Sequence, residues 1–419
     1  MIQAGVNTIQ LNHSDVYGGA SRAAYRIHHG LRCHQIDSLM GVDIKFTDDW
    51  SVHGPFGRLD KALARLRPVL GAACVRMLKT ENAILHSPAL LPSCWPKRLA
   101  NLKPDILHLH WVCGEMISIS EIGRLPGPVV WTLHDMWAFC GAEHYTQDFR
   151  WREGYTSKNR PSYESRLDLN RWVWERKRKY WKRPFHIVTP SHWLGRCVRE
   201  SALMKDWPVT VIPNALNTDV WTPVERSLAR RILGLPEDYP LVLFGAMGGG
   251  KNPIKGFDLL RVSLAHLRDQ RSDLRLLVFG QGTPHEPEDL GFPVHYLGHL
   301  YDDLSLRILY SAADVMVVSS RQEAFGQTAS EAHACGTPVV AFNTCGLPDI
   351  VNHLKNGYLA RPFDTEDLAA GIQWVLADSS RHAELSRNAR EEAVSRFSED
   401  VVIPQYLAVY EKAIMAGTI

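Results

Sequence analysis

The chain has 419 residues, 45% of them apolar and 22% charged, which is typical of a soluble globular protein with two domains. The formal net charge of +2 gives no electrostatic reason to expect nucleic acid as a partner. The 8 cysteines are scattered without a Cys-x-x-Cys pair, so we interpret them as free thiols in a reducing compartment, without disulfides or zinc.

Short β-rich runs recur along the chain, and each is followed by a helix-like stretch. We predict strands in the first half at 6–11, 106–110, 129–133, 185–189 and 209–212. We predict strands in the second half at 241–244, 274–279, 295–297, 315–318, 339–342 and 358–360. Near-continuous apolar strands that alternate with helices indicate parallel sheets covered on both faces. The sequence therefore predicts an α/β protein with two doubly wound, Rossmann-like domains facing across a cleft, where ligands bind at the carboxyl ends of the strands.

The joint between the domains is predicted in the segment 213–223, which is rich in turn-forming residues. We predict an N-terminal domain over 1–208 and a C-terminal domain over 209–397. A last helix over 398–415 is expected to pack back on the first domain.

The first predicted strand ends in a loop with two adjacent glycines, Gly18 and Gly19, before a helix-like stretch. Adjacent glycines at such a turn let a phosphate or a sugar approach the backbone closely. A tight turn without a ligand explains the loop equally well. The loop lacks the Gly-x-Gly-x-x-Gly pattern, and Gly280-Gln-Gly282 has no third glycine in place, which disfavours a nicotinamide enzyme.

Three histidines lie near the ends of predicted strands: His108, His110 and His134. A histidine in this place is more often structural than functional. His108 and His110 face the same way along a strand, which suits a metal, but no third ligand has usable spacing. His134 precedes Asp135 at the end of an apolar strand, and it is the strongest candidate of the three.

The segment Arg171–Arg183 combines basic and aromatic residues at helical spacing. Trp174, Arg178 and Trp181 share one side of such a helix, while Trp172, Arg176 and Lys179 share another. An interfacial surface for anionic lipid headgroups has this pattern. A solvated basic helix whose tryptophans pack on the domain has it too, and this is the preferred interpretation.

A glycine-rich loop, 245–256, follows the first predicted strand of the second half and carries Lys251 and Lys255. Two lysines on such a loop are suited to hold a pyrophosphate and to neutralise it as it leaves. The loop is not a Walker A loop, because Gly256 follows Lys255 where Ser or Thr would be needed. On its own the loop is better interpreted as flexible, with two solvated lysines.

Two carboxylates, Glu323 and Glu331, stand 8 positions apart around the predicted start of a helix. If the helix opens near Phe325, Glu323 lies in the loop and Glu331 lies inside the helix, and the interval spans roughly 12 Å at most. This matches a nucleoside diphosphate sugar from its ribose to its hexose. Free amides at the helix end would face the pyrophosphate in the middle. These amides belong to Gly326, Gln327 and Thr328.

Together these segments resemble the retaining GT-B glycosyltransferases of family four over nearly the full chain. The run from Glu323 to Glu331 is similar to the family's E-x7-E motif, 211–221 to its interdomain segment, and Lys255-Gly256 to its Lys-Gly pair. The loop 12–20 and the segment 132–137 resemble a branch that builds bacterial exopolysaccharides. Gly250 stands where the family usually has an arginine, and we expect Lys251 to substitute for it.

The resemblance implies a retaining hexosyltransferase that uses a UDP- or GDP-linked sugar and a glycan or lipid-linked acceptor, without a metal or another cofactor. Glu331 would bind the ribose and Glu323 the donor sugar, while Lys255 would neutralise the leaving diphosphate and His134 would lie beside the donor sugar. The remaining donor-binding candidates are Gly18, Gly19, Lys251, Phe325, Gly326 and Gln327. Asp15 and His110 are expected on the acceptor side. The alternatives are a nucleotide-sugar-binding protein without transfer activity and a GT-B epimerase.

The sequence shows no basic segment followed by a long apolar one at its start, and no apolar run long enough to span a bilayer. We therefore expect a cytoplasmic protein. The segment Arg171–Arg183 is the candidate for peripheral contact with the inner face of a membrane, through which a lipid-linked acceptor would be reached.

Overall fold

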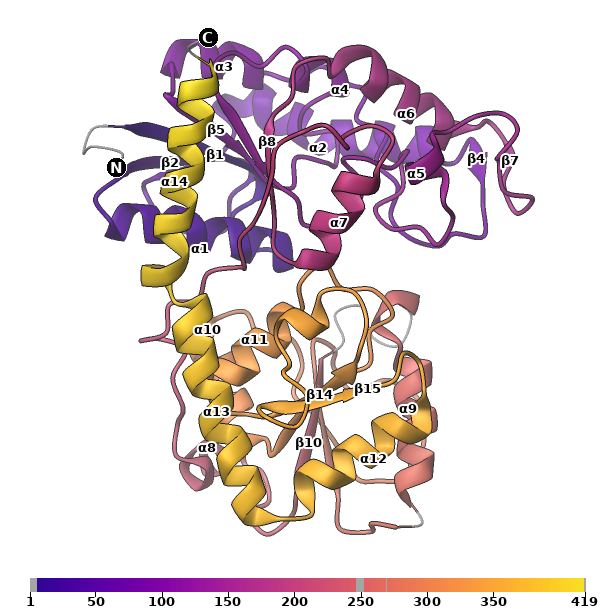
Figure 1. Ribbon diagram of the computed structural model, residues 1–419, viewed down its shortest axis with the longest axis vertical. Coiled ribbons are helices and arrows are strands. Elements are labelled where there is room, and N and C mark those ends of the chain that lie inside the picture. Colours follow the sequence, from indigo (N-terminus) through magenta and orange to yellow (C-terminus); the bar gives the residue numbers. More distant parts are fainter. Residues whose placement is uncertain (1–5, 246–251, 269, 418–419) are drawn as a thin grey trace. The chain divides into compact units, whose positions relative to one another are not determined.

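The computed structural model describes residues 6–245, 252–268 and 270–417, and each of its two compact units is a Rossmann-like α/β domain (Figure 1). Unit 1 consists of Met1–Ala215 with Val402–Ile419, and unit 2 consists of Leu216–Val401. The boundary therefore lies after Ala215, within the segment 213–223 in which the joint was predicted but later than the 208/209 limit given for the domains. The reason is that β9 (Val209–Val211) pairs in parallel with the preceding strand of the first sheet.

Unit 1 is built on a seven-stranded sheet in the order β3-β2-β1-β5-β6-β8-β9, and every pairing within it is parallel. The predicted strands correspond to β1 (Asn7–Ser14), β5 (Ile106–Leu109), β6 (Val129–Thr132), β8 (His186–Thr189) and β9. Two strands of this sheet were not predicted, β2 (Asp37–Ile44) and β3 (Val52–His53). In β2 the acids Asp37 and Asp43 interrupt the apolar run, and β3 is too short to give a pattern.

The helices of unit 1 follow its strands in the alternation that the sequence predicts. They are α1 (Gly19–Cys33), α2 (Gly57–Val75), α3 (Trp95–Leu102), α4 (Ile119–Ile122), α5 (Arg150–Glu153), α6 (Leu169–Tyr180) and α7 (His192–Glu200). A short antiparallel pair, β4 (Leu78–Lys79) with β7 (Ser165–Arg166), lies outside the main sheet. From Val402 on, α14 (Glu399–Gly417) packs Tyr406 and Tyr410 into the core of unit 1 against Val130 and Ile106.

Unit 2 is built on a six-stranded sheet in the order β12-β11-β10-β13-β14-β15, again with parallel pairings. Its strands are β10 (Leu241–Gly245), β11 (Arg275–Phe279), β12 (Val294–Tyr296), β13 (Val315–Val318), β14 (Val339–Phe342) and β15 (Gly357–Ala360). Its helices are α8 (Arg226–Leu233), η2 (Pro253–Lys255), α9 (Phe257–Arg268), α10 (Asp303–Ala312), α11 (Gln327–Ala334), η3 (Leu347–Asp349), α12 (Thr365–Leu376) and α13 (Ser379–Phe397). Alternate residues of β10 enter two separate core clusters, so this sheet is covered on both faces.

Each sheet has a point where its strand order reverses. In unit 1 the chain builds outward from β1 through β2 and β3 and then returns to the other side of β1 with β5. In unit 2 it builds outward from β10 and returns with β13. The loops after the two central strands diverge at such a point and leave a crevice, which is where ligands of open α/β sheets bind. We therefore expect ligand-binding residues in the loops after β1 and β5 and after β10 and β13.

Candidate functional site

At the switch point of unit 2, an ion pair joins the loop after β10 to the loop after β13. Lys255 Nζ donates to Glu323 Oε1 over 2.6 Å, and Ser320 Oγ donates to the same oxygen over 2.8 Å. The side chains of Lys255 and Glu323 are 31% and 15% exposed. The structure thus brings together the lysine and the acid that the sequence placed 68 positions apart, and leaves both within reach of a ligand.

The two loops are fastened to each other by more than this pair. The backbone N–H of Arg321 donates to the carbonyl of Ile254 over 2.7 Å, and its guanidinium donates to both carboxylate oxygens of Asp258 over 2.7 and 2.5 Å. Ser319 Oγ donates to the carbonyl of Lys255 over 3.0 Å. A bidentate Arg–carboxylate pair has a fixed geometry, so the position of Lys255 relative to Glu323 is set before any ligand arrives.

Gly256 makes this close approach feasible. Its φ is +63°, and a Cβ added there would lie 2.0 Å from the carbonyl oxygen of Ser319. The Lys-Gly pair of the sequence is therefore a steric requirement of the fold, since only glycine allows the two loops to meet.

The loop after β13 leads into α11, whose first turn is polarised for an anion. Gly326, with φ +107°, is its N-cap, no described side chain caps it, and no acid lies in the first turn. A Cβ on Gly326 would lie 2.9 Å from Leu347, so glycine is again required. Phe325 is 3% exposed and packs against Phe397, which leaves only its backbone for a ligand. A helix end of this kind attracts phosphate oxygens.

Glu331 lies in the second turn of α11 and is held on both oxygens. Tyr310 Oη donates to Oε2 over 3.0 Å, and Gln327 Nε2 donates to Oε1 over 3.3 Å. The ring of Tyr310 packs against Trp221 and Phe279. Glu331 is only 3% exposed, and these two hydrogen bonds fix the orientation of its carboxylate. Tyr310 gave no signal in the sequence, because nothing marks it as a partner of an acid 21 positions away.

Two of the predicted residues of this site, Gly250 and Lys251, lie outside the described residues. The suggestion that Lys251 substitutes for an arginine therefore stays a prediction. The sequence analysis missed Ser320 and Arg321. Both lie within three positions of Glu323 in the chain, and this proximity could have identified them.

At the switch point of unit 1, Gly18 is the N-cap of α1 with φ +89°, and no described side chain caps this helix. A Cβ on Gly18 would meet no described atom within 4 Å, so the loop leaves open space there. Gly19 begins the helix and is exposed. The structure therefore brings both glycines to the end of β1, beside an uncapped helix start.

Asp15, in the same loop, is completely buried. Its Oδ2 accepts hydrogen bonds from the backbone N–H and the hydroxyl of Thr47, both over 2.8 Å, and both of its oxygens accept from the backbone N–H of Phe46. These bonds tie the loop after β1 to the segment after β2. The carboxylate is occupied by the fold itself, and the acceptor-side role expected of Asp15 stays a prediction.

His134 and His110 lie side by side at the ends of β6 and β5. His134 Nε2 is 3.3 Å from His110 Nδ1, and His110 Nε2 is 3.0 Å from the amide oxygen of Gln10. Burial lowers the pKa of His134 to about 4, and it lowers the pKa of His110 well below its ordinary value. Both rings are therefore neutral at pH 7. Because the Gln10 oxygen can only accept, His110 carries its proton on Nε2 and His134 donates from Nε2, which leaves the lone pair of His134 on Nδ1.

His108 does not share in this arrangement. Its two ring nitrogens are 2.7 Å from the hydroxyls of Tyr410 and Thr132, and it is fully buried. Both nitrogens are already used within the core, so His108 and His110 do not form the start of a metal site.

Asp135 fixes the loop after β6. Its Oδ2 accepts from His144 Nδ1 over 2.6 Å and from Trp111 Nε1 over 2.9 Å, while Oδ1 accepts from the backbone N–H of Trp137 over 2.9 Å. Burial raises the pKa of Asp135, but His144 and the hydrogen bonds outweigh it and hold the pKa below its ordinary value. The ionised carboxylate orients the backbone at His134. The sequence gave no indication of His144 or Trp111.

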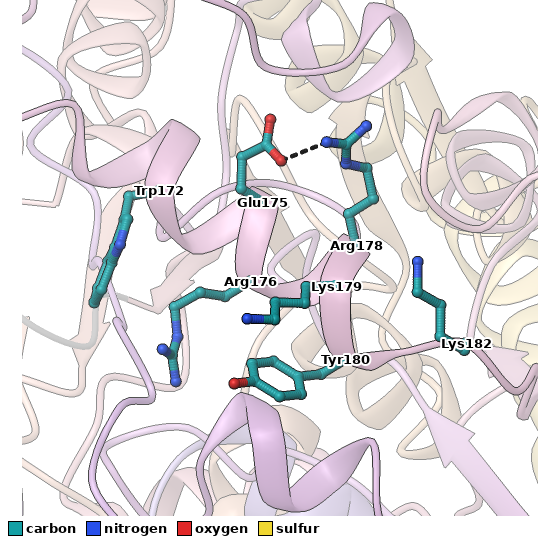
Figure 2. A pocket seen from close by; sticks show the side chains of 7 residues that line it. All are labelled: Trp172, Glu175, Arg176, Arg178, Lys179, Tyr180 and Lys182. Carbon is teal, nitrogen blue, oxygen red and sulfur yellow. Dashed lines mark hydrogen bonds and ion pairs between the residues drawn. The ribbon is translucent and has the colours of Figure 1, made fainter.

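The basic segment of the sequence forms α6 and the residues directly after it. A hollow of about 690 Å³ lies on its surface, and Figure 2 shows the side chains that line it. The lining residues are Trp172, Glu175, Arg176, Arg178, Lys179, Tyr180 and Lys182. Trp174 and Trp181 are instead only 6% and 4% exposed. The preferred interpretation is thus confirmed for these two tryptophans, which pack on the domain, while Trp172 is 42% exposed.

None of the described helices is long and apolar enough to cross a bilayer.

Comparison with known proteins covers both units. Residues 50–220 match the family model described as Glycosyltransferase Family 4, and residues 225–392 match the one described as Glycosyl transferases group 1. A D-inositol 3-phosphate glycosyltransferase of Xylanimonas cellulosilytica is 36% identical over 221 residues, which are 49% of this chain and 51% of that protein. The chain thus spans about half the length of the curated relatives it matches.

Solved structures show the same fold over nearly the whole chain. Sucrose-phosphate synthase from Thermosynechococcus elongatus is similar with a TM-score of 0.68 at 20% identity, covering 98% of this chain and 100% of that one. HepE from Anabaena, in complex with UDP-glucose, is similar with a TM-score of 0.64 at 18% identity, covering 97% of this chain and 99% of that one. At these identities the likeness concerns the fold.

Proposed function

Because the chain belongs to the GT-B glycosyltransferases of family four, we propose that it transfers a hexose from a nucleoside diphosphate sugar to an acceptor hydroxyl, with retention of configuration. The observation that carries this proposal is the Lys255–Glu323 pair, which lies beside the uncapped start of α11 at the switch point of unit 2. A cation, an acid and a helix N-terminus within one crevice suit a ligand with sugar hydroxyls and two phosphates.

The donor would lie along the first turns of α11. Glu331 would accept hydrogen bonds from the ribose hydroxyls, in an orientation set by Tyr310 and Gln327. The N-terminus of α11 would face the pyrophosphate, and Glu323 would accept from hydroxyls of the sugar. The ammonium of Lys255 is held within 2.6 Å of Glu323, so it would lie where the sugar meets the phosphate.

The bond that breaks joins the anomeric carbon to the phosphate oxygen, and the bond that forms joins the same carbon to the acceptor oxygen. In a front-face reaction both oxygens are on one face of the sugar, and the acceptor's proton passes to the departing phosphate oxygen. The phosphate gains negative charge as the bond breaks, and Lys255 with the helix end would stabilise that charge where it develops. Glu323 orients and stabilises, and it serves neither as a general acid nor as a general base.

In unit 1, His134 would accept a hydrogen bond from a substrate hydroxyl through Nδ1. Its neutral state follows from the low pKa caused by burial, so it supplies an oriented lone pair and no positive charge. Gly18 and Gly19 would let the substrate approach the start of α1. His110 would orient His134, because its Nδ1 is the acceptor for the His134 proton, and the acceptor-side role expected of His110 stays a prediction.

A UDP- or GDP-linked donor and a glycan or lipid-linked acceptor are the substrate classes we propose, in the synthesis of cell-surface or exported polysaccharide. Support for the donor class comes from the structurally similar HepE, which binds UDP-glucose. The relatives named D-inositol 3-phosphate glycosyltransferases support a polyhydroxyl acceptor. We expect the reaction at the cytoplasmic side of the membrane. We also expect it without a metal, because Lys255 and the start of α11 would compensate the charge of the diphosphate.

A panel of UDP- and GDP-sugars tests the proposal in two steps. The matching donor should raise the unfolding temperature, because binding to the folded state adds to its stability. With an acceptor present, the same donor should then release nucleoside diphosphate and yield a glycosylated product. Binding without release would identify a nucleotide-sugar-binding protein, and an isomerised donor would identify an epimerase; either result overturns the proposal.

A further inference from the structure

One helix of unit 1 exposes an apolar stripe that the proposed reaction does not use. Along α2, Leu59, Leu63, Leu66 and Leu70 are 74%, 43%, 51% and 45% exposed. Their spacing of four, three and four positions places all of them on one side of the helix. Contiguous exposed leucines on this scale are rare on a monomeric soluble protein and mark a surface that is covered by something else.

The stripe is not a core face that happens to be poorly packed. A different side of α2 packs against the rest of unit 1, and its buried residues are Ala64, Arg67 and Gly71. Arg67 pairs with Asp43 over 3.0 Å, and a Cβ on Gly71 would lie 2.6 Å from Glu115. Small and polar residues thus anchor the helix, while its leucines point elsewhere.

Basic side chains line the flank of the stripe that lies away from the anchored side. Arg58, Arg65 and Arg76 are exposed and fall on this flank at about 100° per residue, while Lys61, also exposed, lies nearly opposite the leucines. None of the four has an ion-pair partner among the residues that the structure describes. Asp60, the one acid within α2, already pairs with Arg98. The helix therefore presents apolar side chains bordered by uncompensated positive charge.

We propose that α2 docks this protein on the surface of a membrane that contains anionic lipids. The leucines would enter the acyl boundary while the cations contact lipid phosphates, which is the arrangement of a helix that lies in the interface plane. The positive charge beside the stripe favours an anionic membrane over a second copy of the chain as the surface that covers the leucines. Two copies joined through the stripe would bring their unpaired cations together, which repels, whereas an anionic bilayer compensates them.

The other candidate for membrane contact, α6, has a less apolar surface than α2. Its outer side carries several cations, but Trp174 and Trp181 are buried, so it offers much less apolar area. The α2 proposal also stands apart from the transfer reaction, because no residue of α2 belongs to the site in either unit.

Co-sedimentation of the full chain with lipid vesicles tests this inference. Wild-type protein should bind vesicles of phosphatidylcholine mixed with phosphatidylglycerol and should bind phosphatidylcholine alone far less. The double variant Leu63→Ser/Leu66→Ser should lower the partition coefficient at least about tenfold, because both methyl-rich side chains leave the interface. Reversing Arg58, Arg65 and Arg76 to Glu should lower it by at least about fivefold per residue, and added salt should weaken the wild type similarly.

Two controls complete the test. Leu228→Ser removes a leucine of similar exposure, 43%, from α8 and should leave vesicle binding unchanged. Unfolding temperatures within a few degrees of the wild type would show that the α2 variants are folded, as expected for exposed positions. Equal binding of the wild type and the leucine variant overturns the proposal. So does loss of binding only on charge reversal in α6, or a dimer in vesicle-free solution that the leucine variant dissociates.

Discussion

Gly256 and Gly234 have nearly the same backbone conformation, with φ of +63° and +65°, but very different surroundings. A Cβ on Gly234, at the end of α8, would meet no described atom within 4 Å. A Cβ on Gly256 would lie 2.0 Å from the carbonyl oxygen of Ser319. The two alanine variants therefore share the cost of a left-handed backbone, and only Gly256→Ala adds a clash.

For Gly234→Ala we expect a loss of about 1 kcal/mol in the free energy of unfolding, from the left-handed conformation alone. For Gly256→Ala the same strain is joined by a contact more than about 1 Å too short, and overpacking of this kind adds about 1–3 kcal/mol. The loop can relieve the clash only by moving away from Ser319. That movement would break the hydrogen bond from Ser319 to Lys255 and separate Lys255 from Glu323.

Urea unfolding measures the stabilities, and calorimetry with the matching nucleotide sugar measures the effect on the site. Gly256→Ala should lose about 2–4 kcal/mol of stability and at least about tenfold in donor affinity, while Gly234→Ala keeps wild-type affinity. The reasoning is refuted if the two variants lose equal stability and Gly256→Ala binds the donor as the wild type does.

Other residues allow independent tests. Burial lowers the pKa of His28 from 6.5 to about 4, so between these pH values the unfolded chain binds a proton that the folded chain does not bind. The free energy of unfolding should therefore be constant above pH 6.5 and fall by up to about 3 kcal/mol toward pH 4, and it should fall less in His28→Asn. Equal pH slopes for the two proteins in urea titrations would contradict this. Asp135→Asn places an NH2 group either where Oδ2 accepts from His144 and Trp111 or where Oδ1 accepts from the backbone N–H of Trp137, and should cost about 2 kcal/mol in the same assay; an unchanged stability would exclude the carboxylate as the anchor of this loop. Glu331→Ala should weaken donor binding at least about tenfold and cost about 1–3 kcal/mol of stability, because it leaves the buried hydroxyl of Tyr310 without its acceptor; undiminished affinity by calorimetry would remove Glu331 from the donor site.

The fold was predictable because buried parallel strands have continuous apolar runs in the sequence. All six strands of unit 2 coincide with predicted runs, and the four central ones, β10, β11, β13 and β14, are buried almost throughout. β2 was not predicted because it contains Asp43, which pairs with Arg67 and accepts a hydrogen bond from Trp95. The burial of this acid depends on partners that are distant in the chain. The domain boundary was misplaced for a related reason: β9 has only half-buried residues, and its place in the first sheet follows from pairing with β8.

The candidate site was predictable where a local pattern carries it. Glu323 and Glu331 stand around the start of α11, and the Lys-Gly pair at 255–256 follows the first strand of its sheet, so topology alone brings them to one edge. The partners that orient these groups were not predictable. Tyr310 reaches Glu331 from another helix, and Asp258 reaches Arg321 from the first turn of α9. Such contacts depend on side-chain packing, which a single sequence does not encode in any short pattern.

Transfer of labelled sugar from the matching donor by Lys255→Ala, compared with Lys205→Ala, tests the central claim most directly. Lys205 is exposed and outside the site, so its variant should transfer at the wild-type rate. Lys255→Ala should retain the fold and lose at least about 100-fold in kcat, as expected when a preorganised positive charge on the leaving group is removed. A Lys255→Ala protein that transfers sugar as fast as Lys205→Ala would contradict the account.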